Sequence, residues 1–271
     1  MEEPILARRF TFPVFGDRKV LVIGAGGGCD VISAHLVAVA LKSVPGNEST
    51  RVVVGNTKKE VKEDFVQISR HIYRVPERVV TIEPKMKVWR TTLIDQSIPR
   101  WADGSPYLVI APKKPAECDL VTAEIRALGF DHIVAVDTGG DTLSMTAASN
   151  TGKVPGRDQR MLAILKNTGI PTSLVVIAPG SDGETSYKDM RANVISRLNL
   201  GNYQGWFPLE PQRAEMERLA RNISRKRTPN IILRAFNRTL KANAEGLLQI
   251  PRHEKPFYPQ AWLCCGMVFA G

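Results

Sequence analysis

The sequence has few cysteines, and their spacing does not suit a metal ion. The 271 residues contain four of them, Cys29, Cys118, Cys264 and Cys265, and no pair has the spacing of metal ligands. The adjacent Cys264 and Cys265 also make a poor disulfide framework. These thiols fit a reducing compartment, and we therefore expect a cytoplasmic protein.

Long hydrophobic runs are missing as well. No apolar run approaches the length of a membrane span, and residues 1–9 lack the basic-then-apolar order of a signal peptide. With 43% hydrophobic and 24% charged residues, the composition is ordinary for a soluble globular protein and unlike that of a disordered one. We therefore expect no membrane partner.

Acidic residues are outnumbered by basic ones, 27 against 37, and much of the excess lies between Arg213 and Lys241. In that stretch Arg218, Arg221 and Arg225 have the spacing of one helical face. Two interpretations remain open, a solvated surface helix and a surface that binds nucleic acid. The first is favoured because no aromatic residues are interleaved to stack on bases.

A glycine-rich loop follows a short apolar run near the start of the chain. Val20 to Ile23 is β-branched and unalternated, as expected for a strand buried on both faces, and an apolar helix to about Leu41 should follow with Asp30 as its N-cap. The loop contains four glycines, Gly24, Gly26, Gly27 and Gly28. Because glycine lets backbone N–H groups approach a ligand beside a helix N-terminus, the loop predicts a site for phosphate or a ribose edge.

The loop does not complete the dinucleotide pattern G-x-G-x-x-G. Cys29 stands where the third glycine belongs, and the next expected strand, Arg51 to Val54, is followed by Gly55, Asn56 and Thr57 instead of a carboxylate for the ribose. This argues against NAD and against a methyltransferase, and nothing indicates flavin or haem. Asp30 would repel a phosphate unless a metal ion or a sugar hydroxyl lay between them, so Mg²⁺ is the candidate cofactor. The alternative is a tight turn that Asp30 only caps.

A second polar loop follows the expected strand Asp131 to Asp137. Asp137 and Asp141 flank the turn Gly139-Gly140, and strand ends of a parallel sheet are where ligands bind. This pair could grip ribose hydroxyls, hold a hydrated Mg²⁺ or activate water. An Asp-rich turn with Asp141 as a helix cap is the alternative.

Two further segments repeat the pattern. Arg157 and Asp158 precede an expected helix, where Asp158 serves either as N-cap or as a site carboxylate. The expected strand Thr172 to Ala178 is followed by a loop with Gly180, Asp182 and Glu184. Glycine and acidic residues thus recur at successive strand ends, which favours one shared site.

Taken together and in this order, the segments Gly24-Ala-Gly-Gly-Gly-Cys-Asp30, Val136-Asp-Thr-Gly-Gly-Asp141 and Pro179-Gly-Ser-Asp-Gly-Glu184 resemble the domain-of-unknown-function 1152 family. The resemblance runs from about Lys19 to Trp262. It implies a Rossmann-like α/β protein of a family known mostly from prokaryotes, and it implies no particular activity. Cys29 stands where the family usually has glycine.

The expected fold is α/β, a Rossmann-like open and mostly parallel sheet with helices on both faces. We expect one domain, 1–271, in which about 200–271 forms a C-terminal helical and β extension. The extension should contain an aromatic bend, two helices and two late strands, at Tyr203–Pro208, Glu210–Arg225, Thr228–Ala244, Gly246–Ile250 and Trp262–Phe269.

Three functions are compatible with these patterns. The first is an enzyme acting on a nucleotide, nucleoside or phosphorylated sugar by metal-assisted hydrolysis or transfer, in which Asp137 and Asp141 hold the metal or hydroxyls and Asp182 or Glu184 is the general base. The second is a nucleotide sensor that uses the same pocket without turnover. The third is nucleic-acid binding through the basic helices 213–241. Cys29 is interpreted as a packed residue or, less favoured, as a nucleophile.

Overall fold

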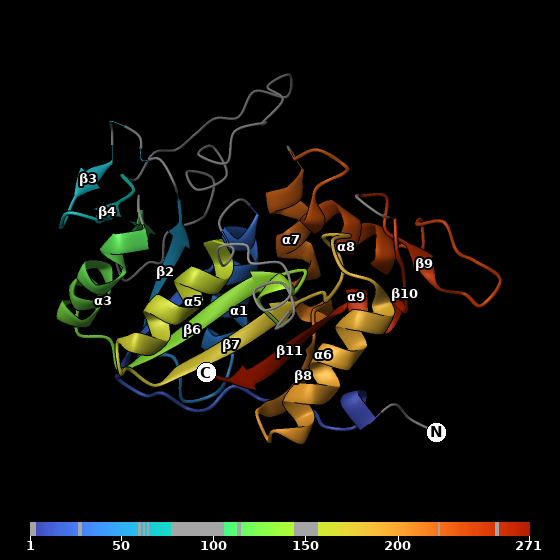
Figure 1. Cartoon of the computed structure of the whole chain (residues 1–271), viewed down its shortest axis with the longest axis horizontal. Helices are drawn as coiled ribbons and strands as arrows, with labels where there is room; N and C mark the ends of the chain where they lie inside the picture. Colours follow the sequence, from blue (N-terminus) through green and yellow to red (C-terminus); the bar gives the residue numbers. More distant parts are fainter. Residues whose placement is uncertain are drawn as a thin grey trace.

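The computed structural model describes residues 4–26, 29–58, 61, 63, 65–76, 106–112, 115–143, 157–221, 223–252 and 255–271. The segment Arg78–Glu83, whose β-branched sequence predicts a further strand, lies outside these residues, as do Gly27 and Gly28. The described chain folds around a nine-stranded sheet with the strand order β3-β4-β5-β2-β1-β6-β7-β11-β8 (Figure 1).

Five parallel strands make up the middle of this sheet. In spatial order they are β5 (Tyr107–Ile110), β2 (Arg51–Thr57), β1 (Lys19–Gly24), β6 (His132–Thr138) and β7 (Thr172–Ile177). Their apolar residues are buried without alternation, as expected for strands covered on both faces. Chain order runs outward from β1 through β2 to β5 and then resumes on the other side of β1 with β6 and β7, so the order reverses between β1 and β6.

Antiparallel strands complete both edges. On one side β11 (Cys265–Ala270) lies between β7 and β8 (Tyr203–Pro208), and on the other β4 (Ile72–Arg74) pairs with β5 and with β3 (Val66–Gln67). The expected aromatic bend at 203–208 is therefore wrong, because these residues alternate between buried and half-buried positions along a strand. The chain after residue 200 contributes to the main sheet as well as to a separate pair, β9 (Leu248–Gln249) with β10 (Phe257–Tyr258).

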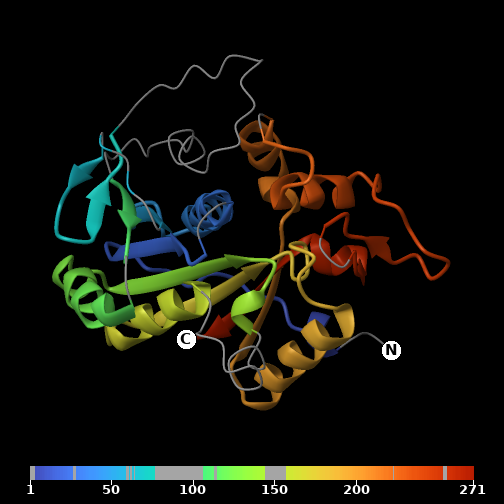
Figure 2. The ribbon, with the colours of Figure 1, turned by 45° about the horizontal axis from the view of Figure 1, so that its top comes forward.

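Helices cover both faces of the sheet (Figure 2). One face packs against α1 (Asp30–Lys42) and α7 (Arg213–Ala220), and the other against α3 (Cys118–Ala127), α5 (Arg157–Asn167) and α6 (Tyr187–Asn199). The Rossmann-like α/β prediction is confirmed. The remaining elements are α8 (Thr228–Phe236), α9 (Gln260–Leu263) and four 3₁₀ turns, Pro4–Leu6, Pro115–Glu117, Asp141–Leu143 and Glu210–Gln212. Within the described part of the chain, no helix has both the length and the apolar character needed to cross a bilayer.

The two late helices are shorter than their sequence patterns predicted. Helix α7 ends at Ala220, where the side-chain amide of Asn230 donates to the carbonyls of Ala220 (3.2 Å) and Ile223 (2.9 Å). The expected helical face of Arg218, Arg221 and Arg225 is therefore wrong, because Arg225 lies beyond the helix. Helix α8 ends at Phe236, before Arg238 with its positive φ of 51°.

The predicted late strand 262–269 is divided, and the one at 246–250 is shortened. Trp262 and Leu263 belong to helix α9, and the strand begins only at Cys265. The strand at 246–250 is reduced to Leu248–Gln249. An apolar run alone did not distinguish the short helix from the strand, because both bury their side chains here.

A side-chain hydrogen bond joins the two helices on the α1 face. His35, on the apolar surface of α1, is 2% exposed, and its Nε2 lies 2.8 Å from Oε1 of Glu215 on α7. Arg218 donates to both oxygens of the same carboxylate, at 2.8 and 2.7 Å. These hydrogen bonds, from Arg218 first and then from His35, lower the pKa of Glu215 to about 2, against an opposing effect of burial.

We expect Glu215→Gln to remove stability at neutral pH but not in strong acid. A carboxyl whose pKa is lowered by folding stabilises the protein above its unfolded pKa, and the contribution is lost as pH falls through the folded pKa. For Glu215 the window runs from about pH 4.5 down to about 2. Since the side chain is partly exposed, we expect about 1 kcal/mol, or roughly 2–4 °C in Tm.

Thermal unfolding of both proteins from pH 6 to pH 2.5 measures this effect. The variant should melt below the wild type at pH 6, and the gap should close in acid. Glu245→Gln, a change at an exposed position, is the matched control and should leave the gap near zero throughout. A difference that stayed constant with pH would show that Glu215 acts through packing alone.

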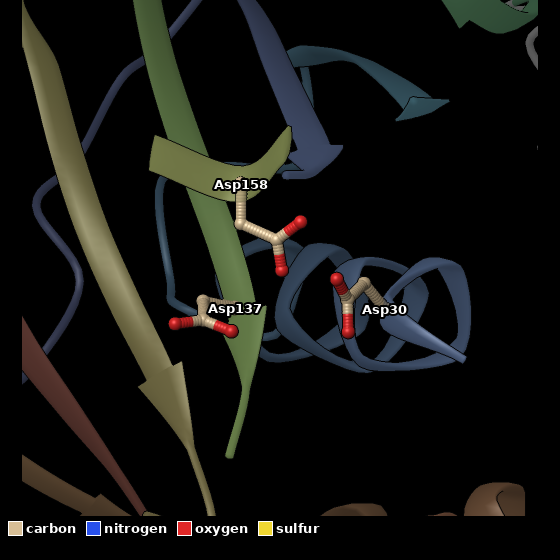
Figure 3. A group of neighbouring side chains, drawn as sticks. All are labelled: Asp30, Asp137 and Asp158. Atoms are coloured by element: carbon tan, nitrogen blue, oxygen red, sulfur yellow. The ribbon is translucent and has the colours of Figure 1, made fainter. Parts of the chain in front are cut away.

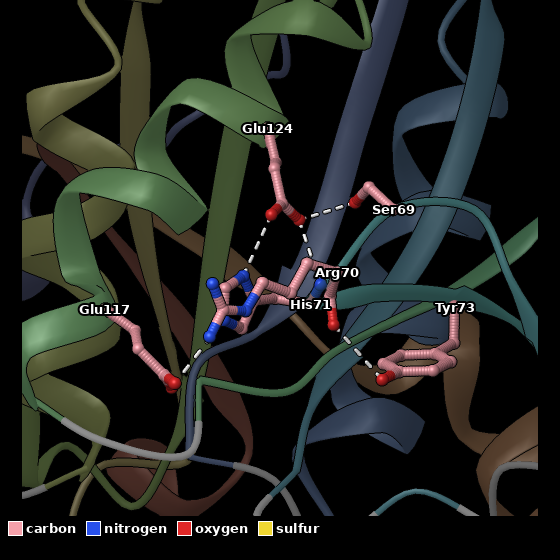
Figure 4. A network of polar contacts seen from close by, with 6 residues as sticks. All are labelled: Ser69, Arg70, His71, Tyr73, Glu117 and Glu124. Atoms are coloured by element: carbon pink, nitrogen blue, oxygen red, sulfur yellow. Dashed lines mark hydrogen bonds and ion pairs between the residues drawn. The ribbon is translucent and has the colours of Figure 1, made fainter.

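A network of hydrogen bonds connects the residues between β3 and β4 with helix α3 (Figure 4). The buried His71 places Nδ1 2.9 Å from Oε1 of Glu124 and Nε2 3.6 Å from Oε2 of Glu117. The other oxygen of Glu124 accepts hydrogen bonds from the Ser69 hydroxyl at 2.5 Å and the His71 N–H at 3.0 Å. Burial raises the pKa of Glu124, but these hydrogen bonds outweigh it and lower the pKa overall. The network thus holds the short β3–β4 pair against helix α3.

Candidate functional site

The point where the strand order reverses, between β1 and β6, is where the candidate site lies. In open α/β sheets the crevice outside the carboxyl ends of the strands at such a point is the usual ligand site. Here β1 ends at Gly24 and leads to the glycine loop, and β6 ends at Thr138 and leads to Gly139 and Gly140. Both loops predicted from the sequence therefore meet at one place.

Three carboxylates from three different elements converge there (Figure 3). Asp30 is the first residue of α1, Asp137 is the penultimate residue of β6, and Asp158 is in the first turn of α5. One oxygen from each lies within 4.8 Å of the others. With this spacing, the three side chains could hold one metal ion. Asp30 is 7% and Asp137 1% exposed, and Asp158 is half-buried. Close, buried like charges raise one another's pKa or recruit a cation.

Asp30 faces the glycine loop instead of capping its helix. The N-cap position is taken by Cys29, whose side chain makes no cap hydrogen bond, and Oδ2 of Asp30 accepts the N–H of Gly26 at 2.8 Å. The predicted N-cap role is therefore wrong. Burial first, then the charges of Asp158 and Asp141, raise the pKa of Asp30, although hydrogen bonds from Thr138 and Gly26 act in the opposite direction.

Because Gly26 has no side chain, the space between the carboxylates of Asp30 and Asp158 stays open. A Cβ built on it would lie 2.1 Å from Oδ2 of Asp158 and 2.6 Å from Oδ2 of Asp30. Gly24 has a different role, because a Cβ there would lie 2.9 Å from atoms of both Asn56 and Asp30, so its small size lets α1 start against the strand end. The loop is thus shaped around the acidic group.

One oxygen of Asp137 has no hydrogen-bond partner among the described residues. Oδ2 accepts bonds from the N–H of Thr142 at 3.0 Å and from the Thr142 hydroxyl, whereas Oδ1 is buried and, in the part of the chain that the structure describes, unpaired. Burial and then the charges of Asp30 and Asp158 raise the pKa of Asp137 to about 8. A buried oxygen without a donor needs either a proton or a cation.

The predicted residues of the other two loops lie beside this group. Asp141 begins the 3₁₀ turn after Gly140, and burial followed by the charges of Asp137, Asp158, Asp182 and Glu184 raises its pKa to about 10. Asp182 is 7% exposed, and its Oδ1 accepts the N–H of Glu184 at 3.1 Å, whereas Glu184 is exposed. The carboxylates of the three loops therefore share one electrostatic environment.

The glycines of these loops allow close packing. Gly139 has a φ of 107°, and a Cβ on it would lie 2.3 Å from Oδ2 of Asp182. Gly140 packs on Val176, and Gly180 packs on the ring of Tyr258, where a Cβ would lie 1.9 Å from Cζ. Gly180 is therefore needed for the close packing of this loop on Tyr258.

Cys29 directly precedes Asp30 at the start of α1. The charges of Arg227 and Arg252 act on the Cys29 thiol and lower its pKa, but burial and the charge of Asp30 outweigh them and raise it to about 11. A thiol with this pKa stays protonated near neutral pH, which argues against the nucleophile interpretation of Cys29.

Comparison with known proteins identifies the family. The family model described as "Protein of unknown function (DUF1152)" matches residues 21–240. The chain belongs to the DUF1152 family. The resemblance inferred from the three loops is therefore confirmed. No curated protein and no solved structure matches the chain.

The region matched by the DUF1152 model holds all three converging carboxylates and Arg227, whereas Arg252 lies beyond it. The predicted metal pair was Asp137 with Asp141, and the structure groups Asp137 with Asp30 and Asp158 instead. Arg157 lies in the first turn of α5, and its side chain is outside the described residues.

Sequence reasoning missed the partner of Asp137. Thr142 holds one of its oxygens through two hydrogen bonds, from five residues along the chain. A threonine after an Asp-rich turn is too common to signal such a contact in advance.

Proposed function

We propose that this DUF1152 protein is an enzyme that binds a small phosphate- or ribose-containing ligand together with Mg²⁺ at the carboxyl edge of its sheet. The observation that carries the proposal is the convergence of Asp30, Asp137 and Asp158, with the buried Oδ1 of Asp137 unpaired among the described residues. A turn stabilised only by capping would not bring three acids from three elements together.

The residues present fit a hard divalent cation. Carboxylate oxygens are the ligands Mg²⁺ prefers, and oxygens on one such ion lie roughly 3–4 Å apart. The 4.8 Å limit on the present group is close to that spacing, so small side-chain movements would suffice. A bound cation would also relieve the mutual repulsion of carboxylates that the fold holds in a buried place.

The chain's own groups have separate tasks in this proposal. Backbone N–H groups of the glycine loop contact the phosphate or ribose, and Asp141 binds a hydroxyl or assists with the cation. Asp182 or Glu184 takes the proton of an attacking water or hydroxyl. When bound, Mg²⁺ would neutralise charge on a phosphate and act as a Lewis acid there. Hydrolysis or group transfer at a phosphorylated or glycosidic centre is the reaction class this supports.

The proposed setting is the cytoplasm. All four cysteines are free thiols, and three of them, Cys29, Cys264 and Cys265, have a pKa raised mainly by burial. Buried protonated thiols suit a reducing compartment and need no disulfide partner.

Thermal unfolding against nucleotides, dinucleotides, nucleosides and sugar phosphates, each with and without Mg²⁺, tests the proposal. A ligand at about 100 times its Kd stabilises the folded state by about 2.7 kcal/mol, or roughly 5–10 °C in Tm for a chain of this size. We expect a rise that needs both Mg²⁺ and one class of ligand. The absence of any rise across the panel would contradict the site.

Product formation then separates an enzyme from a sensor. The ligand that gives the largest shift is incubated with the protein and Mg²⁺, and products are followed by chromatography. Turnover supports the enzyme. Saturable binding without product would favour a nucleotide sensor that uses the same site.

A further inference from the structure

A cavity of about 610 Å³ lies at the opposite end of the sheet from the acidic group. Its lining includes His132, the first residue of β6, and Ser173, the second residue of β7, whereas the acidic group lies at the carboxyl ends of the strands. Small-molecule sites usually have volumes of about 300–1,000 Å³. We infer that this cavity is a second ligand site, and that its ligand is a small aromatic acid.

The segment that precedes β1 forms the outer wall of the cavity. At one end its backbone pairs with the edge strand β8, where the N–H of Trp206 donates to the carbonyl of Arg8 at 3.0 Å and the N–H of Phe10 donates to the carbonyl of Trp206 at 2.7 Å. At the other end the N–H of Phe15 donates to the side-chain oxygen of Asn47 at 2.6 Å. The wall is therefore anchored on both sides of the cavity, which gives a ligand a site that is already formed.

Aromatic rings supply the apolar part of the lining. Phe10, Phe12 and Phe15 all line the cavity. The rings of Phe10 and Phe12 pack edge-to-face with their centroids 5.2 Å apart, and Phe12 makes a second such contact with Phe207. The ring of Phe15 lies 5.1 Å from that of His132. Because aromatic rings prefer edge-to-face or offset contacts with one another, this wall favours a ligand with a ring of its own.

The polar groups along the sheet side of the cavity are uncharged. His132, Ser173 and Gln204 line it and are half-buried, and Nε2 of His132 lies 3.1 Å from Oγ of Ser173. Burial, followed by the charge of Arg18, lowers the pKa of His132, so its ring is neutral near pH 7. These groups suit a neutral polar substituent of the ligand.

The charged residues that line the cavity are both cations. They are Arg8 and Arg9, and no acidic residue of the described chain is among the lining residues. Arg9 pairs with Trp206 across the sheet, and its guanidinium carbon lies 4.5 Å from the centroid of that side chain's ring. Since successive strand residues point to opposite faces, Arg8 points away from the Trp206 side, to the face on which Phe10 packs. Arg8 is therefore the cation that faces the aromatic wall.

This combination selects an aromatic ring with a negative charge. A carboxylate can accept two parallel hydrogen bonds from one guanidinium group, which makes the contact specific as well as charged. A cationic ligand would be repelled by both arginines. A ligand of phosphate groups alone would leave the phenylalanine wall without a partner. An aromatic acid places its ring against the wall and its carboxylate at Arg8.

The test uses 2-naphthoate as the probe and 2-naphthamide as its uncharged analogue, both titrated by calorimetry without Mg²⁺. We expect 2-naphthoate to bind at least ~10-fold more tightly, as hydrogen bonds to charged groups imply. Arg8→Gln should remove most of this preference and leave the affinity for 2-naphthamide unchanged. Arg9→Gln, a loss of the same charge at the next residue, is the matched control and should weaken 2-naphthoate less than about threefold.

Thr11→Trp tests whether the probes occupy this cavity. Thr11 lines the cavity at an exposed position, so an indole there should fill the space without disturbing the fold. Both probes should then bind at least ~10-fold more weakly, and unchanged affinity would overturn the inference. It would also be overturned if 2-naphthoate did not bind, if the two probes bound equally, or if Arg8→Gln and Arg9→Gln had equal effects. None of these results bears on the acidic group, because its carboxylates do not line this cavity.

Discussion

Asp137→Asn is expected to abolish the Mg²⁺-dependent rise in Tm while raising the Tm of the metal-free protein. The two effects have opposite signs because Asp137 is a ligand when the cation is present and, when it is absent, a buried carboxyl that folding forces to hold a proton well above its ordinary pKa. The asparagine oxygen can still accept the two hydrogen bonds from Thr142, so the loop should keep its shape. The asparagine side chain is neutral without taking up a proton, and its amide can donate toward Asp30 or Asp158.

Metal titration followed by differential scanning calorimetry measures both effects. Changes in groups that only orient metal ligands cost about 10–100-fold in affinity, so the loss of a ligand should cost at least ~100-fold. Removal of the buried ionisable carboxyl should raise the metal-free Tm by roughly 2–4 °C for each kcal/mol gained.

The matched control is Asp17→Asn. Asp17 is exposed and precedes β1, at the opposite edge of the sheet, so its replacement should change neither measurement. An Asp137→Asn protein that bound Mg²⁺ as tightly as the wild type would rule out the proposed cation site.

Gly26→Ala is expected to block the site by filling the space between the carboxylates. The φ of Gly26 is not positive, so the change acts through the added methyl group and not through backbone strain. That methyl would overlap Oδ2 of Asp158 and Oδ2 of Asp30, and both side chains would have to turn away. Overpacking of this kind costs about 1–3 kcal/mol.

Mn²⁺ binding and Tm are the readouts for this variant. We expect Mn²⁺ affinity to fall at least ~100-fold, as for loss of a ligand, and Tm to fall by roughly 2–10 °C. Gly55→Ala on the neighbouring strand β2 is the control, because its φ is not positive and a Cβ there has its nearest neighbours at 3.4 Å. If Gly26→Ala bound Mn²⁺ normally, the carboxylates would not act through the space beside this loop.

Local sequence pattern was sufficient for the elements that are buried on both sides. The run before Gly24 and the runs that end at Thr138 and Ile177 were predicted as strands, because a strand covered on both faces has a continuous apolar, β-branched sequence. The meeting of the glycine and aspartate loops was predicted for a second reason, because parallel strands bring their carboxyl ends to one edge of the sheet.

The late part of the chain was harder to predict from local pattern. Tyr203–Pro208 is an edge strand that owes its conformation to pairing with β11, which lies some 60 residues further along the chain. Helix α7 ends at Ala220, whose carbonyl accepts a hydrogen bond from the Asn230 side chain, although the residues after Ala220 are compatible with helix. Contacts that are distant in sequence overrode local propensity in both cases.

The sequence by itself determined the α/β class, the family and the edge of the sheet on which polar residues gather. The tertiary structure decided which acids meet, Asp137 with Asp30 and Asp158. The reason is physical: hydrophobic periodicity and glycine placement are properties of a single segment. The distances between charges on α1, β6 and α5 exist only once the strand order and the helix packing have brought those segments together.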